Sequence, residues 1–387
     1  MQGVLIAAVP DAGDGVRYRL LSDDGAPVEP VKAAAAPALG DLAAVERRYR
    51  PRWVFDAAAA CYPRLLAGGV RIERCHDVSL TERILLGRQG RFDEPCRAPA
   101  VVARRDGRPP PADPGVAAAP GAQHALFDAD GDTDDTAALL EDVSAAYRDQ
   151  LARVDASAGG AAAVDAGIAV PSGALRLLIA AESGSALVAA EMTRTGLPWD
   201  AAVHERILTD TLGPRPPAGT RPARMAELAA SITEAFGFPV NPDSAVDLRA
   251  AFQRAGFDIE TTRAWVIRDL DHPAVAPVLA YKDLARLYTA NGWNWLQDWV
   301  SDGRLVSEYL PGAVVSGRWA TRGGGGLQLP KAVRSAAVAR PGYVLVVADA
   351  AQLEPRVLAA VAGDRALAAV SRGADLYDGL AADGFGG

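Results

Sequence analysis

In the first 90 residues, short apolar runs alternate with stretches in which apolar positions recur every three or four residues. The short runs are rich in valine, leucine, isoleucine and aromatic residues and favour β-strands: "GVLIAAVP", "RYRLLS" and "RWVFDA". The longer stretches, "AAVERRYR" and "SLTERILLG", have the helical period instead. This mixture predicts an α/β domain.

The pattern changes at about residue 91. Residues 91–130 are rich in proline, alanine and glycine and show no periodicity, so we expect a disordered loop there. The helical run "TAALLEDVSAAYRDQLARV" follows this loop. We assign it to the first domain, which therefore comprises residues 1–90 and 130–155.

From residue 172 the chain is strongly helical. The apolar residues of "ALRLLIAAESGSALVAAEMTRTG" follow the 3.6-residue period, and Thr195 and Gly196 end this helix. Three further helices are expected at residues 223–236, 243–255 and 273–300, the second capped by Asn241 or Asp243. After about residue 305 the pattern turns to strands and loops, ending in the apolar run "YVLVVAD".

Length and composition narrow the class of protein. A chain of 387 residues is long enough for two or three domains. Its net charge of −8 argues against a uniformly basic nucleic-acid binder but allows a local arginine groove. Three cysteines without a C-x-x-C pair predict reduced thiols and no zinc site. No stretch approaches the roughly 20 apolar residues of a membrane span, so we expect a cytoplasmic protein without membrane association.

The run "YVLVVADAAQLEPRVLAAVAGD" raises the question of catalytic chemistry. It predicts a buried strand that ends at Asp349, followed by a helix with Glu354 in its first turn. A carboxylate at the carboxyl end of a central strand is well placed to bind Mg²⁺ for phosphoryl transfer. The alternatives are that Asp349 only caps the next helix and that Glu354 is a solvated carboxylate near a helix start.

This run resembles the first catalytic palm motif of family A DNA polymerases, D-Y-S-Q-I-E-L-R. The matching positions are Asp349, Gln352, Glu354 and Arg356, whereas Ala350, Ala351 and Pro355 depart from the motif. Upstream, "SGRWATRGGGGLQLPK" is similar to the family's T-G-R-x-S-S…L-Q-N-I-P segment, with Arg318 and Gln328 at its DNA-contacting positions. The resemblance covers residues 172–387. In overall layout it is closest to actinobacterial bifunctional 3′–5′ exonuclease/DNA polymerases.

The resemblance implies a template-directed, DNA-directed DNA polymerase, a nucleotidyltransferase of DNA replication and repair that uses two Mg²⁺ ions. Asp349 would bind metal, and Gln352 and Glu354 would face the incoming dNTP, with Glu354 excluding a 2′-hydroxyl. Arg318, Gln328 and Arg356 would contact primer–template DNA, although a purely structural Arg356 is an equal alternative. The fold class implied is α+β and multidomain, with an RNase H-like exonuclease-type domain, a helical thumb at 172–310 and a partial palm at 311–387.

Two of the family's motifs have no match in this sequence. The fingers helix with its Arg and Lys, and the later motif with a second metal-binding carboxylate, would both follow residue 387. We therefore expect a fragment that cannot complete nucleotide transfer alone, since one carboxylate rarely holds two metal ions.

The first domain is expected to keep an exonuclease fold without its chemistry. In the family the first strand carries D-x-E, but here it reads "GVLIAAVPDAG", and Pro63 occupies roughly the place of another carboxylate. Tyr147 and Asp149 do not restore the final Y-x-x-x-D. Asp77 resembles a mainly structural aspartate, and its neighbour His76 is expected to point away from it.

The loop contains a separate motif. Gln123, Leu126 and Phe127 in "QHALFDAD" form Q-x-x-L-F, which resembles the pentapeptide that binds the bacterial sliding clamp. Such a peptide inserts its apolar side chains into a pocket, and a flexible tether keeps it accessible. A chance match, or a Leu-Phe pair that packs back on the protein, is the alternative.

Two functions from different classes therefore remain open. The first is a family A DNA polymerase present without its later motifs, and the second is a non-catalytic DNA- and clamp-binding module with degenerate nuclease and polymerase parts. A working nuclease is disfavoured by the missing carboxylates.

Overall fold

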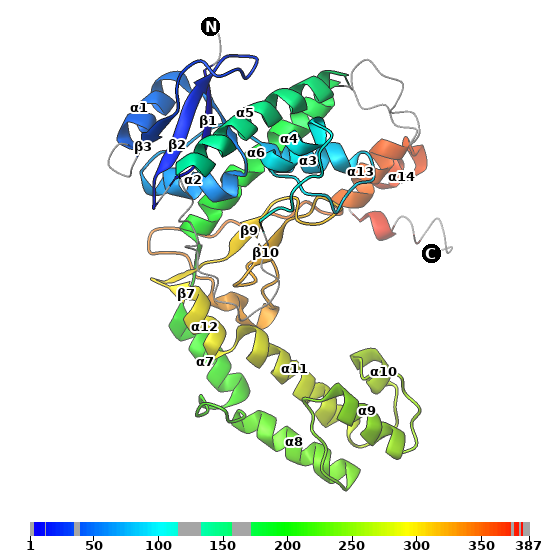
Figure 1. Cartoon of the computed structure of the whole chain (residues 1–387). Helices are drawn as coiled ribbons and strands as arrows, with labels where there is room; N and C mark the ends of the chain where they lie inside the picture. Colours follow the sequence, from blue (N-terminus) through cyan, green and yellow to red (C-terminus); the bar gives the residue numbers. More distant parts are fainter. Residues whose placement is uncertain are drawn as a thin grey trace. The chain divides into compact units, whose positions relative to one another are not determined.

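A computed structural model describes residues 4–11, 13–34, 39–114, 133–156, 172–372, 375–378 and 381. The chain divides into two compact units, residues 1–337 and residues 338–387. Each unit is described by itself below, with element labels as in Figure 1.

The larger unit begins with a five-stranded sheet. Its strands are β1 (Leu5–Pro10), β2 (Val16–Leu21), β3 (Lys32–Ala34), β4 (Arg52–Phe55) and β5 (Cys75–Asp77), in the spatial order β3-β2-β1-β4-β5. β1, β2 and β3 pair antiparallel, whereas β1, β4 and β5 run parallel. The three strands predicted from "GVLIAAVP", "RYRLLS" and "RWVFDA" are confirmed as β1, β2 and β4.

Helices cover both faces of this sheet (Figure 1). Alternate residues of β1 pack to opposite sides, because side chains alternate along a strand. Ile6 and Ala8 join a core with helices α1 (Leu39–Tyr49) and α2 (Ala58–Ala67). Leu5, Ala7 and Val9 join a second core with α4 (Ala98–Arg105) and α5 (Thr133–Ala156).

The prediction of a disordered loop over 91–130 is wrong for its first part. Residues 91–114 are placed in the structure, and α4 lies among them with Ala98, Val101 and Val102 buried. This helix packs against α5, so its burial supplies the stability that its local composition does not indicate.

Helix α6 (Ser172–Thr195) has the predicted span and packs beside β5, at the edge of the sheet. The Ser183 hydroxyl accepts a hydrogen bond of 3.0 Å from the Asp77 backbone, and the Cys75 thiol donates one of 3.1 Å to the Ser183 carbonyl. Among the described helices, α6 is the one long and apolar enough to cross a membrane by length and composition. The prediction that no stretch approaches a membrane span is therefore wrong by this measure, and α6 packs here against α2, α3 (Val78–Gly87) and β5.

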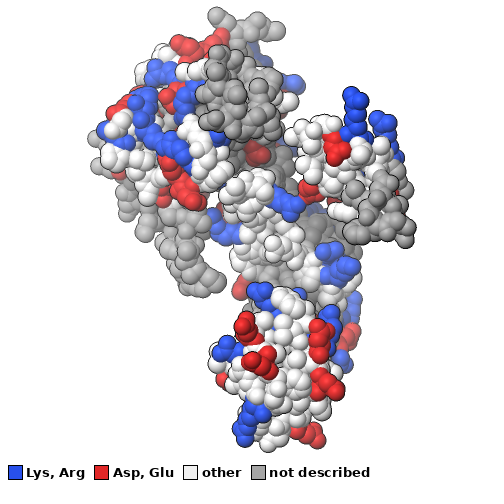
Figure 2. All heavy atoms as spheres, turned by 90° about the vertical axis from the view of Figure 1, so that its right-hand side faces the viewer, with Lys and Arg blue, Asp and Glu red and all other residues white. Residues whose placement is uncertain are grey.

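The remainder of the larger unit is mainly helical. Its helices are α7 (Ala201–Leu212), α8 (Ala223–Phe236), α9 (Ala245–Arg254), α10 (Ala264–Arg268), α11 (Val275–Asn291) and α12 (Trp293–Trp299). On the face shown in Figure 2, the lowest part of the molecule carries acidic and basic side chains side by side, with no region of a single charge sign.

The expected helices of this part are confirmed with two changes. Helix α9 is capped by Ser244, whose side chain accepts a hydrogen bond from the Asp247 backbone, and not by Asn241 or Asp243. The helix predicted over 273–300 is divided at Gly292, where a Cβ would lie 2.2 Å from the Tyr288 carbonyl oxygen. Glycine is needed there because any side chain would collide with the preceding turn.

Short strands complete this unit, one of them before α7 and the others after α12. β6 (Leu197–Pro198), β7 (Val300–Ser301) and β8 (Arg304–Leu305) form a three-stranded sheet, and β9 (Glu308–Leu310) pairs antiparallel with β10 (Ala320–Arg322). A 3₁₀ helix, Lys331–Ala336 (η3), packs against α7 at the end of this unit.

The smaller unit contains helices α13 (Leu353–Ala362) and α14 (Arg365–Val370). The strand predicted at "YVLVVAD" is not formed: residues 343–350 belong to no helix or strand, and Val347 is 91% exposed. A strand needs a neighbour for its backbone N–H and C=O groups, and no described strand pairs with this run. Asp349 therefore does not end a buried strand in this structure.

Candidate nucleotide and nucleic-acid site

The motif residues of the smaller unit meet at the start of α13. Gln352, at the N-cap of α13, has a left-handed backbone (φ 53°). Its side-chain amide donates a 2.7 Å hydrogen bond to Asp375 and accepts one of 2.9 Å from the Leu376 backbone. The hydrogen bond from Gln352 also lowers the pKa of Asp375. Gln352 thus ties the first turn of α13 to residues 375–376.

Arg356 also stabilises this turn through backbone contacts. Its Nε donates a 3.0 Å hydrogen bond to the Ala351 carbonyl, and its Nη1 donates to the Ser371 carbonyl. Of the two predicted roles for Arg356, these bonds favour the structural one, because two guanidinium nitrogens are bound to backbone oxygens of the same unit.

The two carboxylates of the motif are exposed. Asp349 lies three residues before Gln352, and Glu354 occupies the first turn of α13. Among the residues that the structure describes, no group of three or more His, Cys, Asp or Glu side chains could hold a metal ion. The described residues therefore do not make up a two-ion magnesium site around Asp349.

Arg318 and Gln328 belong to the other unit. Both are exposed, and they flank β10 and a turn of four consecutive glycines, Gly323–Gly326. The Arg318 carbonyl accepts a 3.1 Å hydrogen bond from Ala313, and the Gln328 backbone donates one of 2.8 Å to Gly325. The structure thus places both side chains on the surface, on loops whose backbones are fixed by hydrogen bonds.

The glycine turn is held by two side chains that the sequence analysis did not identify. The Trp295 indole donates a 3.1 Å hydrogen bond to the Gly324 carbonyl, and the Ser307 hydroxyl donates one of 3.2 Å to the Gly323 carbonyl. The Gly326 backbone donates a 3.0 Å hydrogen bond back to Ser307. We call this arrangement the glycine latch: Trp295, Ser307 and Gly323–Gly326.

Only glycine fits the first two positions of the latch. Gly323 and Gly324 have φ of 67° and 60°. A Cβ on Gly323 would lie 1.9 Å from the Trp299 ring, and one on Gly324 would lie 2.4 Å from the Ser307 hydroxyl. Four consecutive glycines in the sequence indicate such a close approach, but they do not indicate which residues approach.

The expected site residues therefore fall into three groups. Gln352, Glu354 and Arg356 lie together at the start of α13, with Asp349 just before them, whereas Arg318 and Gln328 lie on the larger unit. The residues of the clamp motif, Gln123, Leu126 and Phe127, lie outside the described part of the chain.

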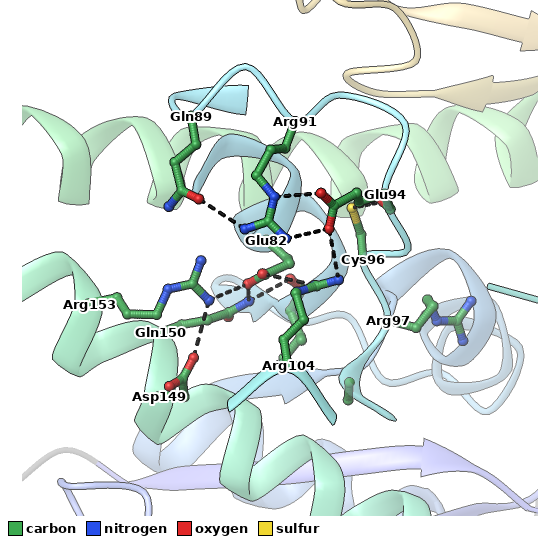
Figure 3. A network of polar contacts seen from close by, with 12 residues as sticks. Glu82, Gln89, Arg91, Glu94, Cys96, Arg97, Arg104, Asp149, Gln150 and Arg153 are labelled. Carbon is green, nitrogen blue, oxygen red and sulfur yellow. Dashed lines mark hydrogen bonds and ion pairs between the residues drawn. The ribbon is translucent and has the colours of Figure 1, made fainter. Parts of the chain in front are cut away.

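The N-terminal domain contains a buried polar network that sequence reasoning missed (Figure 3). The fully buried Glu82 accepts hydrogen bonds from Arg104 at 2.9 Å, Arg153 at 2.8 Å and the Gln150 amide at 3.1 Å. These partners come from α4 and α5, so one carboxylate on α3 joins three helices. Burying a carboxylate is tolerated when it is fully paired in this way.

Two further carboxylates follow the ends of parallel strands. Asp56, after β4, accepts hydrogen bonds from Arg97 at 2.6 Å and from the Ala98 backbone at 2.7 Å. Asp77, at the end of β5, accepts from Leu80 and from Ala58. Burial raises the pKa of Asp77 to about 6, and both aspartates serve as acceptors for helix starts.

His76 points away from Asp77, as expected. Its Nε2 lies 2.8 Å from the Gln150 side-chain oxygen, and its ring packs edge-on against Tyr147. Burial lowers the pKa of His76 to about 4, so the ring is neutral at pH 7. No acid–base pair is formed by these two neighbours.

Comparison with known proteins agrees with the motifs. Residues 220–387 match the family model of DNA polymerase family A. DNA polymerase I of Chloroflexus aurantiacus (strain ATCC 29366 / DSM 635 / J-10-fl) is 30% identical over 187 residues, which make up 42% of this chain and 20% of that protein. The matched part of the chain is thus similar to DNA polymerases of family A, the family that the residues around Asp349 resemble.

Among solved structures, the fold is similar to the POL domain of Pol1 from M. smegmatis, in complex with DNA primer-template and dNTP. The likeness covers 99% of this chain and 64% of that chain, with a TM-score of 0.67 and 19% identity. At this identity it concerns the fold, and it supports the mixed α and β class predicted from the sequence. The chain spans a fifth of the curated relative and 64% of the solved one.

Proposed function

We propose that this chain forms the primer–template and nucleotide-facing part of a family A DNA polymerase, whose reaction is template-directed addition of dNTPs to a primer. The observation that carries the proposal is the D-x-x-Q-x-E-x-R arrangement at the start of α13, within the region that matches the family. The solved structure that shares the fold holds primer-template and dNTP, the ligands proposed for this chain.

Each motif residue has a proposed role. Glu354 faces the sugar of the incoming nucleotide and excludes a 2′-hydroxyl, and Gln352 positions the turn from which Glu354 projects. Arg318 and Gln328 contact the primer–template, where arginine gives charge-assisted contacts that tolerate any sequence. Asp349 is the proposed magnesium ligand, and the described residues do not complete a metal site around it.

We further propose that the described residues of 4–114 and 133–156 form an RNase H-like, exonuclease-type domain that does not cut. The strand order β3-β2-β1-β4-β5 supports the fold. The sequence of β1, LIAAVP, has no carboxylate, and Asp56 and Asp77 are engaged by backbone N–H groups and Arg97. In this proposal the carboxylates of the domain hold its helices in place and do not serve the hydrolysis of DNA.

The second candidate is a non-catalytic DNA-binding module, which could also bind the sliding clamp through Gln123, Leu126 and Phe127. The observation that favours it is that no metal-binding group occurs among the described residues. The clamp interaction rests on the sequence motif alone. Replacing Leu126 and Phe127 by alanine should abolish it in a pull-down with purified clamp, and unchanged binding would remove the idea.

A binding experiment separates the two candidates. A fluorescent primer–template is titrated with the chain in Mg²⁺, alone and with the complementary or a mismatched dNTP. The polymerase proposal predicts tighter binding with the complementary dNTP only, and Glu354→Ala should let the matching ribonucleotide act as well. The module predicts primer–template binding that no nucleotide changes.

Matched variants complete this experiment. Arg318→Ala with Gln328→Ala should weaken primer–template binding, whereas Arg88→Ala, at an exposed arginine of the N-terminal domain, should not. If the chain binds no primer–template at all, both candidates fail.

A further inference from the structure

The segment "RRYRPR", residues 47–52, concentrates positive charge on a chain whose net charge is −8. Arg47 and Arg48 form the last turn of α1, Tyr49 ends the helix, and Arg50 follows in the turn to β4. These four residues are all exposed. No acidic side chain lies between them in the sequence, so their charges add along one short surface segment.

The turn itself is rigidly built. Arg50 has a left-handed backbone (φ 45°), which is uncommon for a residue with a side chain. The guanidinium of Arg74 donates two hydrogen bonds, of 3.0 and 2.6 Å, to the Arg50 carbonyl. The exposed Arg74 thus joins the segment, and we call Arg47, Arg48, Tyr49, Arg50 and Arg74 the arginine turn.

Hydrogen bonds to a buried carboxylate stabilise the backbone next to the arginine turn. The carboxylate of Glu46, buried beneath the turn, accepts a 2.8 Å hydrogen bond from the Trp53 indole and one of 3.0 Å from the Glu73 backbone. The negative charge of Glu46 is thereby directed inwards. Glu73 is the acidic side chain that reaches the surface here, and it pairs with Arg50 at 3.6 Å.

Two of the arginines are free to bind a ligand. Among the described residues, the guanidinium groups of Arg47 and Arg48 form no hydrogen bond or ion pair. Arg48 lies over the Tyr49 ring, 5.2 Å from its centroid, and Tyr49 is 51% exposed. An arginine cluster with an exposed aromatic ring is the combination that binds phosphates and stacks an unpaired base.

The arginine turn is separate from the sites described above. It lies where β4 begins and just before β5, whereas Asp56 and Asp77 lie at the carboxyl ends of those parallel strands. It also shares no residue with the glycine latch or with α13. It is therefore not accounted for by the proposed polymerase function.

We propose that the arginine turn is a binding site for a single-stranded polynucleotide. Arg47, Arg48 and Arg74 contact successive phosphates, and Tyr49 stacks against an unpaired base. A single strand fits better than a duplex because Tyr49 needs an accessible base face. This proposal does not depend on the polymerase function.

The test uses the full chain and a fluorescent 20-nucleotide single strand, as DNA and as RNA of the same sequence, without dNTP. Binding is measured by anisotropy at several salt concentrations. The double variant Arg47→Gln with Arg48→Gln should weaken binding at least tenfold. The slope of log K against log salt concentration should become less steep by about 1.4, because each lost phosphate contact removes about 0.7. The control is Arg88→Gln with Arg148→Gln, which removes the same charge from two other exposed positions of this domain.

Tyr49 provides an independent readout. Tyr49→Ala should weaken binding roughly tenfold with an unchanged salt slope, whereas Tyr49→Phe should bind like the original chain. The proposal is overturned if the Arg47/Arg48 pair and the Arg88/Arg148 control pair lose the same affinity for the single strand. It is also overturned if Tyr49→Ala and Tyr49→Phe bind the single strand equally well. Comparison of the DNA and RNA strands shows which polynucleotide the site prefers. Thermal unfolding of each variant confirms that it is folded.

Discussion

The Tyr62 hydroxyl donates a 2.8 Å hydrogen bond to the carboxylate of Glu191. Tyr62 lies on α2 in the N-terminal domain, and Glu191 lies on α6. Arg71 binds the same carboxylate through Nε and Nη2, and its hydrogen bonds lower the pKa of Glu191. Burial raises the pKa of Tyr62, so its hydroxyl keeps the proton that it donates.

Tyr62→Phe should therefore destabilise the docking of α6 on the N-terminal domain. The variant loses a hydrogen bond to a charged group and leaves the Ile72 backbone N–H, which donates to Tyr62, without its acceptor. We expect a loss of about 1.5–3 kcal/mol in the free energy of unfolding, measured by urea denaturation. Tyr18→Phe, at a half-buried tyrosine of β2, is the control and should change stability by less than about 0.5 kcal/mol.

Glu82→Ala should cost about 3–5 kcal/mol, because it leaves Arg104, Arg153 and Gln150 without their shared carboxylate in the domain interior. Glu29→Ala is the matched control: Glu29 pairs with Lys32 at the surface, outside this network, and its loss should cost less than about 1 kcal/mol. The urea midpoint of each variant gives the comparison. Equal effects would show that the network around Glu82 adds little to stability.

His76 should make the N-terminal domain acid-sensitive. Its pKa is lowered from 6.5 to about 4 in the folded chain, so the stability that it contributes is complete above pH 6.5 and is lost as the pH falls towards 4. The full difference is about 3 kcal/mol at 1.36 kcal/mol per pH unit. His76→Gln, which does not titrate, should unfold at a urea midpoint that falls less between pH 6.5 and pH 4.

The titration of Asp77 changes the stability of the domain in the opposite direction to that of His76, over a similar pH range. Its raised pKa of about 6 means that its contribution is present below pH 3.8 and is lost as the pH rises through 6. The comparison of His76→Gln with the original chain is therefore made at each pH, so that the contribution of Asp77 cancels. A pH profile that is the same in both proteins would contradict the prediction.

Two glycines of the latch distinguish the cost of backbone strain from the cost of a steric clash. Gly323→Ala and Gly325→Ala both place a side chain at positive φ, but only the first places a Cβ against Trp299; a Cβ on Gly325 meets nothing within 4 Å. We expect Gly325→Ala to lower the free energy of unfolding by about 1 kcal/mol. Gly323→Ala should lower it further, because its Cβ also meets the Trp299 ring. If the latch positions Gln328 for DNA, Gly323→Ala should also weaken primer–template binding at least tenfold, with little change in Gly325→Ala.

Much of the local structure could be predicted from the sequence because it depends on neighbouring residues. β1, β2, β4, α6 and α8 follow their apolar periods, and Gly196 follows α6 as predicted. The division of α11 from α12 could not be read from periodicity, since it depends on a collision between Gly292 and the Tyr288 carbonyl. Helix α4 was missed because its stability comes from packing on α5.

The site was predictable where a motif is contiguous and not where contacts join distant residues. Gln352, Glu354 and Arg356 could be named in advance, but the bonds of Arg356 to Ala351 and Ser371 depend on tertiary structure. Nothing in the local sequence distinguishes Glu82, Trp295 or Ser307 from other residues of their types, because their partners lie far away in the chain. The wrong prediction at residues 343–349 arose because apolar β-branched residues indicate strand propensity, whereas a strand also needs a partner.

The exposed run at 343–347, Tyr-Val-Leu-Val-Val, also has a consequence for the solution behaviour of this chain. It combines high β propensity with no charge and no proline, and its backbone pairs with none of the described strands. Such a segment is a template for strands from other molecules, so self-association of this chain should begin here and grow with concentration. Asp349 at the end of the run opposes this association by charge repulsion between neighbouring copies.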